Sequence, residues 1–173
     1  MAQNVIQQPG HYPEAAMPAN PTAAPCTTPP TPQTPYLKLG GEAALRRLTE
    51  RFYALMDELP EAWTIRQMHP ENLAGSQQSL FEFLSGWLGG PPLFAHKRGH
   101  PRLRMRHAPY PIGNQARDEW MLCMRLALAE QVPDEGFREA LTLAFEQMAQ
   151  HLINDAGEHA CGHSHSDAGH SHA

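Results

Sequence analysis

A basic stretch of the chain contains a histidine whose backbone is restricted. From residue 83 to residue 117 there is no aspartate or glutamate, whereas six basic side chains lie in this cationic stretch: Lys97, Arg98, Arg102, Arg104, Arg106 and Arg117. Like charges at this density repel one another in a folded segment, so an anionic ligand that neutralises part of them would account for the arrangement. His107 lies in the same stretch and is followed by Pro109 and Pro111, which restrict its backbone.

Haem is a ligand that would use both features. Its two propionates need cations at the edge of a pocket, and its iron needs a neutral imidazole from the protein. The alternative is that the arginines form a solvated surface and that His107 is an ordinary histidine. Composition alone weighs the two interpretations about equally.

A second group of metal-binding residue types lies at the C-terminal end. Its spacing could hold zinc, nickel or copper on six side chains: His159, Cys161, His163, His165, His170 and His172. The alternative is a flexible, solubilising tail. The pattern is compositional, so both interpretations stay open.

The elements that must position these residues lie between two polar ends. Nine of the 17 prolines fall within residues 1–36, which predicts a disordered arm, and the Gly-, Ser- and His-rich residues 156–173 predict a flexible tail. The folded domain is then expected over residues 37–155. Its 3.6-residue apolar periodicity predicts helices over 45–59, 70–88, 120–128 and 137–152, no strand, and a long functional loop over 89–117. The fold class is therefore all-α.

Overall composition excludes several classes of protein. The chain has 173 residues and a net charge of -5, which fits one domain without a general affinity for nucleic acid. The first residues lack a secretory signal, and no segment is long enough to span a bilayer, so a cytoplasmic location without membrane attachment is expected. Three cysteines make no disulfide framework, and Cys123 is expected to be inert packing on a helix.

The motifs of residues 37–155 resemble those of group II truncated haemoglobins, small bacterial globins with a two-over-two helical sandwich around haem. The similarity is strongest in GGPPLFAHKRGHPRLRMRHAPYPIG at residues 89–113 and in RDEWMLCM at residues 117–124. ERFYALMDELP and HPENLAGSQQSLFEFLSGWLGGP extend it towards the N-terminus. The resemblance implies a haem b cofactor.

The resemblance also implies roles for single residues. His107, in RLRMRH, falls at the proximal iron ligand, Tyr53 in RFY at the distal tyrosine, and Trp120 in RDEW at the indole that closes the distal pocket. His69 falls at the corner before the distal helix, and Ser76 and Leu80 fall on that helix facing the iron. The expected propionate partners are Arg98, Arg102 and Arg104.

These roles imply a globin that reversibly binds oxygen, nitric oxide or carbon monoxide. Hydrogen bonds from Tyr53, Trp120 and His69 would slow the release of oxygen. One alternative is redox catalysis, either nitric oxide dioxygenation or peroxide reduction, which would need a reductase. Others are a haem-based ligand sensor acting through the proline-rich arm, or a metal store in the His-rich tail. A monomer or a homodimer is expected.

Overall fold

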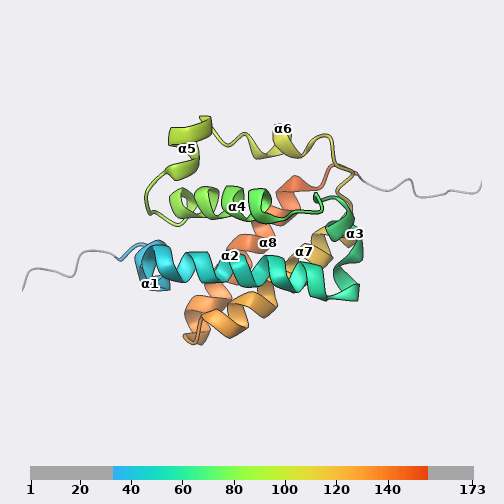
Figure 1. Cartoon of the computed structure of the whole chain (residues 1–173). Coiled ribbons are helices and arrows are strands. Elements are labelled where there is room, and N and C mark those ends of the chain that lie inside the picture. The colour runs from blue at the N-terminus through green and yellow to red at the C-terminus, as the bar shows by residue number, and fades with distance from the viewer. Residues whose placement is uncertain (1–32, 156–173) are drawn as a thin grey trace, which may run out of the picture. The chain divides into compact units, whose positions relative to one another are not determined.

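The computed structural model describes residues 33–155, and in this range all regular structure is helical (Figure 1). The elements are α1 (Pro35–Leu39), α2 (Gly41–Glu58), the 3-10 helix η1 (Pro60–Ala62), α3 (Trp63–Gln67), α4 (Ala74–Trp87), α5 (Leu93–Arg98), α6 (Leu103–His107), α7 (Asn114–Gln131) and α8 (Glu135–Leu152). Residues 1–32 of the predicted arm and all of the predicted tail lie outside the described residues.

The domain is built from two pairs of long helices. α2 packs against both α4 and α7, and α7 packs against α8, to which it is joined by a short turn. The apolar stripes of all four helices meet in one core, in which Phe52, Phe81, Met124 and Phe145 are fully buried. The predicted all-α, two-over-two arrangement is thus confirmed.

Two of the predicted helices have the expected ends. α2 ends at Glu58, just before Pro60, which cannot continue an α-helix because its ring would clash with the preceding turn. α8 begins after Pro133, and the carboxylate of Asp134 caps it by accepting a hydrogen bond from the N–H of Phe137 at 2.9 Å.

The prediction that residues 89–117 form one long loop is wrong. This segment contains the short helices α5 and α6, and α7 already begins at Asn114. Each short helix has only five or six residues, which is too few for an apolar period to be recognised in the sequence. Figure 1 shows the segment running past α4 on the side away from α2.

The distal helix also begins later than predicted. Pro70 lies in a turn, and α4 starts at Ala74, whose N–H is bonded to the side chain of Asn72 at 2.9 Å. The guanidinium of Arg66 donates to the carbonyls of Pro70 and Glu71 at 3.2 and 3.1 Å, so this turn is tied to α3. α3 was not predicted either.

The Gly89-Gly90 pair follows α4, as the sequence indicates, and each glycine is required for a different reason. Gly89 has a φ of +84°, in the left-handed region that favours glycine. A Cβ atom on Gly90 would lie 2.5 Å from the ring of Tyr36, so only glycine lets α1 pack here. The helix α1 itself begins at Pro35, two residues before the predicted start of the folded domain.

Among residues 33–155 no helix is long and apolar enough to cross a membrane.

Candidate functional site

Three predicted distal residues come together from three different elements. Tyr53 projects from α2, His69 follows α3, and Trp120 lies on α7. The ring centroids of Tyr53 and His69 are 5.7 Å apart. The ring of Phe52 links Tyr53 to Trp120, with centroid distances of 4.9 Å and 5.1 Å. These side chains form one aromatic group, which we call the distal cluster (Tyr53, His69 and Trp120).

The distal cluster holds two hydrogen-bond donors that the described residues do not use. Tyr53 is buried, and this burial raises the pKa of its hydroxyl, which therefore keeps its proton. Within residues 33–155, neither the Tyr53 hydroxyl nor the half-buried Trp120 indole N–H donates a hydrogen bond to a protein acceptor. Both donors therefore lack a protein acceptor within this range.

His69 has a different role from the donor expected from the sequence. Its Nδ1 lies 2.8 Å from the carbonyl oxygen of Ile65, which can only accept, so Nδ1 carries the ring proton. Burial lowers the pKa of His69, and the neighbouring charge of Arg66 lowers it further. The ring is therefore neutral, and its Nε2 is an acceptor with a free lone pair rather than a donor.

A buried carboxylate that the sequence did not single out holds α3 in place. Glu119 lies on α7 beside Trp120, and its Oε2 accepts a hydrogen bond from the N–H of Ile65 at 2.8 Å. Its Oε1 accepts from Gln115 at 3.0 Å, and Gln115 also donates to Thr64 at 2.9 Å. The helix that presents Trp120 thus also anchors the one that leads to His69. The available signal was an acidic residue immediately before Trp120, at the start of a predicted helix.

His107, the predicted proximal ligand, is the last residue of α6 and is half-buried. Its Nδ1 lies 2.8 Å from the carbonyl oxygen of Leu103, so this nitrogen carries the proton when the ring is neutral. The other nitrogen, Nε2, then presents a lone pair. A metal-binding histidine usually has this arrangement, in which a backbone carbonyl fixes the tautomer and the ring orientation.

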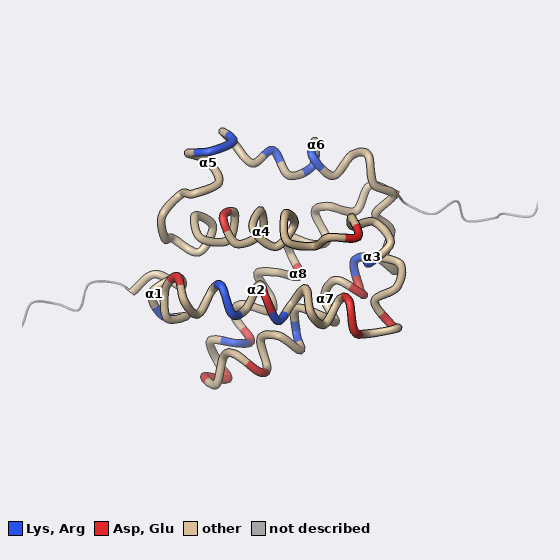
Figure 2. The backbone as a smooth tube through the Cα atoms, viewed as in Figure 1, with Lys and Arg blue, Asp and Glu red and all other residues tan. Residues whose placement is uncertain are grey.

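The protein itself neutralises part of the cationic stretch, for which an external anion is one of the two interpretations that the sequence allows. Figure 2 shows basic residues along α5 and α6, with an acidic residue on the facing side of α4. That residue is Glu82, which immediately precedes the stretch. Its Oε1 lies 2.6 Å from Lys97 Nζ, and its Oε2 lies 3.8 Å from Arg98 Nε.

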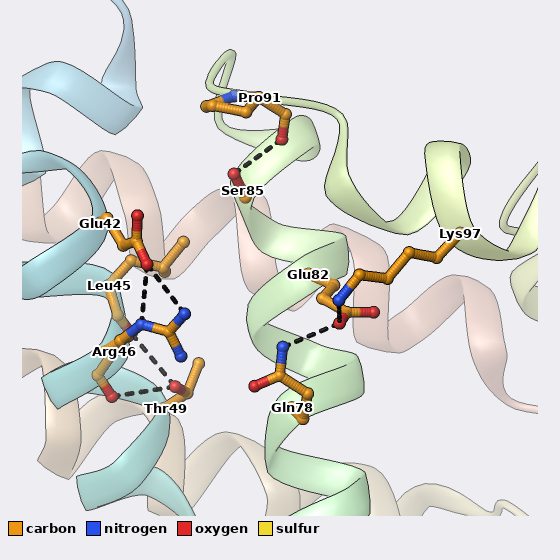
Figure 3. Close-up of polar contacts among 9 residues, drawn as sticks. All are labelled: Glu42, Leu45, Arg46, Thr49, Gln78, Glu82, Ser85, Pro91 and Lys97. Atoms are coloured by element: carbon orange, nitrogen blue, oxygen red, sulfur yellow. Dashed lines mark hydrogen bonds and ion pairs between the residues drawn. The ribbon is translucent and has the colours of Figure 1, made fainter.

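Glu82 is buried almost completely, with an exposed fraction of 1 %. Figure 3 shows its carboxylate between Gln78, one turn earlier on α4, and Lys97 of α5. The hydrogen bond from Gln78, at 2.8 Å, and the one from Lys97 hold the pKa of this carboxyl below its ordinary value. Glu82 is therefore ionised at neutral pH and links α4 to α5.

The three predicted propionate partners differ in what they contact. Arg98 faces Glu82 and stacks over the ring of Phe94 at 5.6 Å, and Arg104 donates to the carbonyl of His151 at 3.1 Å. Arg102 begins α6 in the left-handed conformation, with φ +43°, and its side chain makes no hydrogen bond or ion pair within the described part of the chain. Arg102 is thus the uncommitted cation of the three.

Ser76 and Leu80 lie one turn apart on α4 and are both half-buried, so they share a helix face. Leu80 packs against the edge of the core, as do Leu73 and Trp120. No described hydrogen bond joins Ser76 to the distal cluster.

A surface groove of about 600 Å³ reaches His69 from the side of α3. It is lined by Trp63, Arg66 and the acidic Asp57, Glu58 and Glu71. His69 is therefore the member of the distal cluster that lines the groove.

The remaining histidines of the cationic stretch and Cys123 do not join the site. His96 and His100 are exposed. Cys123 is buried, and burial raises the pKa of its thiol to about 11, in keeping with an inert packing residue. The predicted tail ligands His159, Cys161, His163, His165, His170 and His172 lie outside the described residues. Within residues 33–155 no group of three or more histidine, cysteine or acidic side chains could hold a metal ion.

Comparison with known proteins gives one consistent result. Residues 34–154 match the family described as bacterial-like globin. The chain is 35% identical to the group 2 truncated hemoglobin YjbI of Bacillus subtilis over 114 residues, which are 66% of this chain and 84% of that protein.

Two solved structures are also similar. One is the cold-adapted truncated hemoglobin of Pseudoalteromonas haloplanktis TAC125, with 48% identity, a TM-score of 0.69, and coverage of 70% of this chain and 98% of that one. The other is the group II 2-on-2 hemoglobin of Agrobacterium tumefaciens, with 47% identity, a TM-score of 0.69, and coverage of 70% and 95%.

Proposed function

Because the chain belongs to the bacterial-like globin family, as a group II truncated haemoglobin that binds haem, we propose that His107 is the residue that would hold the iron of a haem b. The observation that carries this proposal is the hydrogen bond from His107 Nδ1 to Leu103, which leaves the Nε2 lone pair for the iron. None of the other described histidines combines this geometry with a position in the cationic stretch.

The surrounding residues fit the group chemically. The distal cluster and the half-buried Leu73 and Leu80 offer an apolar lining, which haem's porphyrin ring needs. Arg102 is the propionate partner that the contacts favour, because Arg98 and Arg104 already have protein partners. One cation and one imidazole thereby come from the two ends of the same short helix.

The function that follows is reversible binding of a diatomic gas such as oxygen, nitric oxide or carbon monoxide. When bound, haem would supply the iron at which such a gas binds. Tyr53 and Trp120 donate hydrogen bonds to the ligand, and each is worth roughly 1.5 to 3 kcal/mol when the acceptor carries charge. Two such donors in a buried setting predict slow release of oxygen, which suits a redox role better than transport.

The acceptor character of His69 favours peroxide reduction as the second candidate function. A neutral imidazole with a free Nε2 can take a proton from a peroxide held beside Tyr53 and return it later. Turnover of this reaction, or of nitric oxide dioxygenation, requires electrons from a reductase.

The proposal is tested by absorption spectra of the haem-loaded full chain, in the ferric, ferrous and carbon monoxide forms. His107→Gly should lose the histidine-ligated spectrum and regain it when free imidazole is added. His96→Gly, a change of an exposed histidine in the same segment, should leave the spectra unchanged. Spectra of His107→Gly that match the wild type would show that the iron is held elsewhere, and the proposal would fail.

A further inference from the structure

The short helix that carries His107 packs only at the surface, against α8. None of the five residues of α6 is buried, and the helix begins at the left-handed Arg102. The ring of His107 is bonded to Leu103 within the same helix, so ring and helix turn together as a unit. The direction of Nε2 therefore depends on what holds α6 from outside.

Asn154, just beyond the end of α8, contacts the backbone on both sides of this turn. Its Nδ2 donates to the carbonyl of His107 at 3.1 Å, and its Oδ1 accepts from the N–H of Ile112 at 2.9 Å. An amide can do both at once, whereas a carboxylate only accepts and an aliphatic group does neither. One residue thus closes the segment between His107 and Ile112.

The main chain around Asn154 extends the same attachment. The N–H groups of Asn154 and Asp155 both donate to the carbonyl of Ile112, at 3.0 and 3.1 Å. Ile112 is itself buried in the core, so the attachment is anchored to the rest of the domain. One turn earlier on α6, Arg104 donates to the carbonyl of His151 on α8.

We propose that Asn154 is a positioning residue for the proximal histidine: its side-chain amide couples the His107 carbonyl to Ile112 and thereby sets where Nε2 of His107 points. This rests on the proposed role of His107 as the iron ligand. Asn154 is exposed, so a substitution there leaves the core intact. Its effect should therefore concentrate on the His107 turn.

Three variants of the haem-loaded full chain test this. Asn154→Ala removes both hydrogen bonds, Asn154→Asp keeps the acceptor for Ile112 but removes the donor to His107, and Asn114→Ala is the matched control at an exposed asparagine. Two quantities are measured: the hydrogen-exchange rate of the Ile112 amide, and the iron–histidine stretching band of the ferrous form by resonance Raman spectroscopy.

The exchange rate of Ile112 and the iron–histidine band should respond differently to the two Asn154 variants. Asn154→Ala should speed exchange at Ile112 about tenfold, as expected for the loss of one hydrogen bond, and should shift or broaden the iron–histidine band. Asn154→Asp should keep the protection of Ile112 and still move the band. Asn114→Ala should change neither.

Other outcomes would overturn the positioning role of Asn154. An Ile112 exchange rate that is unchanged in Asn154→Ala would mean that the amide contact does not hold the turn. A wild-type band in both Asn154 variants would mean that the contact holds the turn without orienting His107. If Asn154→Ala does not fold, Asn154→Asp alone decides through the band. A wild-type chain that shows no iron–histidine band refutes the role of His107 itself, which distinguishes failure of the proposed function from failure of this inference.

Discussion

Replacing Glu82 with glutamine should lower the free energy of unfolding by more than the loss of a single exposed ion pair would. The carboxylate is buried and accepts two hydrogen bonds at one oxygen, from Gln78 and from Lys97. Glutamine keeps the shape and one acceptor oxygen but loses the negative charge. Lys97 and Arg98 then face a neutral group and each other.

The magnitude follows from those contacts. A hydrogen bond to a charged group contributes about 1 kcal/mol more than a neutral one, which applies in full to the bond from Gln78. The contribution of Lys97 is smaller because 59% of its side chain is exposed and the interaction is screened by solvent. Lys97 and Arg98 also lose the negative charge that neutralises them. The sum of these effects should decrease the free energy of unfolding by about 2 kcal/mol.

The assay is urea unfolding of the haem-loaded full chain, followed by circular dichroism at neutral pH. With a slope of about 2 kcal/mol per molar, the midpoint should fall by about 1 M. Glu146→Gln is the matched control, since its ion pair with Arg125 is similarly short, at 2.6 Å, but exposed on both sides. That control should lose no more than about 0.5 kcal/mol. Equal losses in the two variants would refute the reasoning from burial.

The same variant has a defined pH dependence. The folded pKa of Glu82 lies below its ordinary value, so its stabilising effect is complete above that ordinary value and is lost as the pH falls through the folded pKa. The difference in midpoint between wild type and Glu82→Gln should therefore stay constant from pH 7 to about 5 and narrow as the pH is lowered from there to about 3. A difference that stays constant down to about pH 3 would contradict the assignment.

Two further predictions concern the haem pocket. Tyr53→Phe should raise the oxygen dissociation rate constant about 10- to 100-fold, because it removes one donor to a charged ligand, whereas Tyr110→Phe, at an exposed tyrosine, should leave the rate unchanged in stopped-flow measurements. A rate unaffected by Tyr53→Phe would remove this residue from the distal role. Arg102→Ala should speed haem transfer to an acceptor apoprotein about twofold to fivefold, as for one exposed ion pair, and Arg47→Ala should not; equal transfer rates would place the propionates elsewhere.

Local patterns in the sequence predicted much of the fold and the types of residue at the site. The apolar period of α2 and α8 is long and regular, so these helices could be read directly, and proline and glycine marked most of their ends. Short elements escaped this reasoning. In α5 and α6 the chain makes too few turns for a periodic signal, so a segment with two helices was expected to be a loop.

The sequence by itself determined the all-α fold, the cationic stretch and the identity of the candidate ligands, because these depend on residue type and local spacing. Only the tertiary structure decided which groups neutralise the cationic side chains and which groups orient or anchor the candidate ligands. Glu119 and Ile65 are 54 positions apart, and Asn154 and His107 are 47 apart, so no local pattern connects them. The protonated nitrogen of His69 was likewise decided by the carbonyl that its ring meets, and this turned an expected donor into an acceptor.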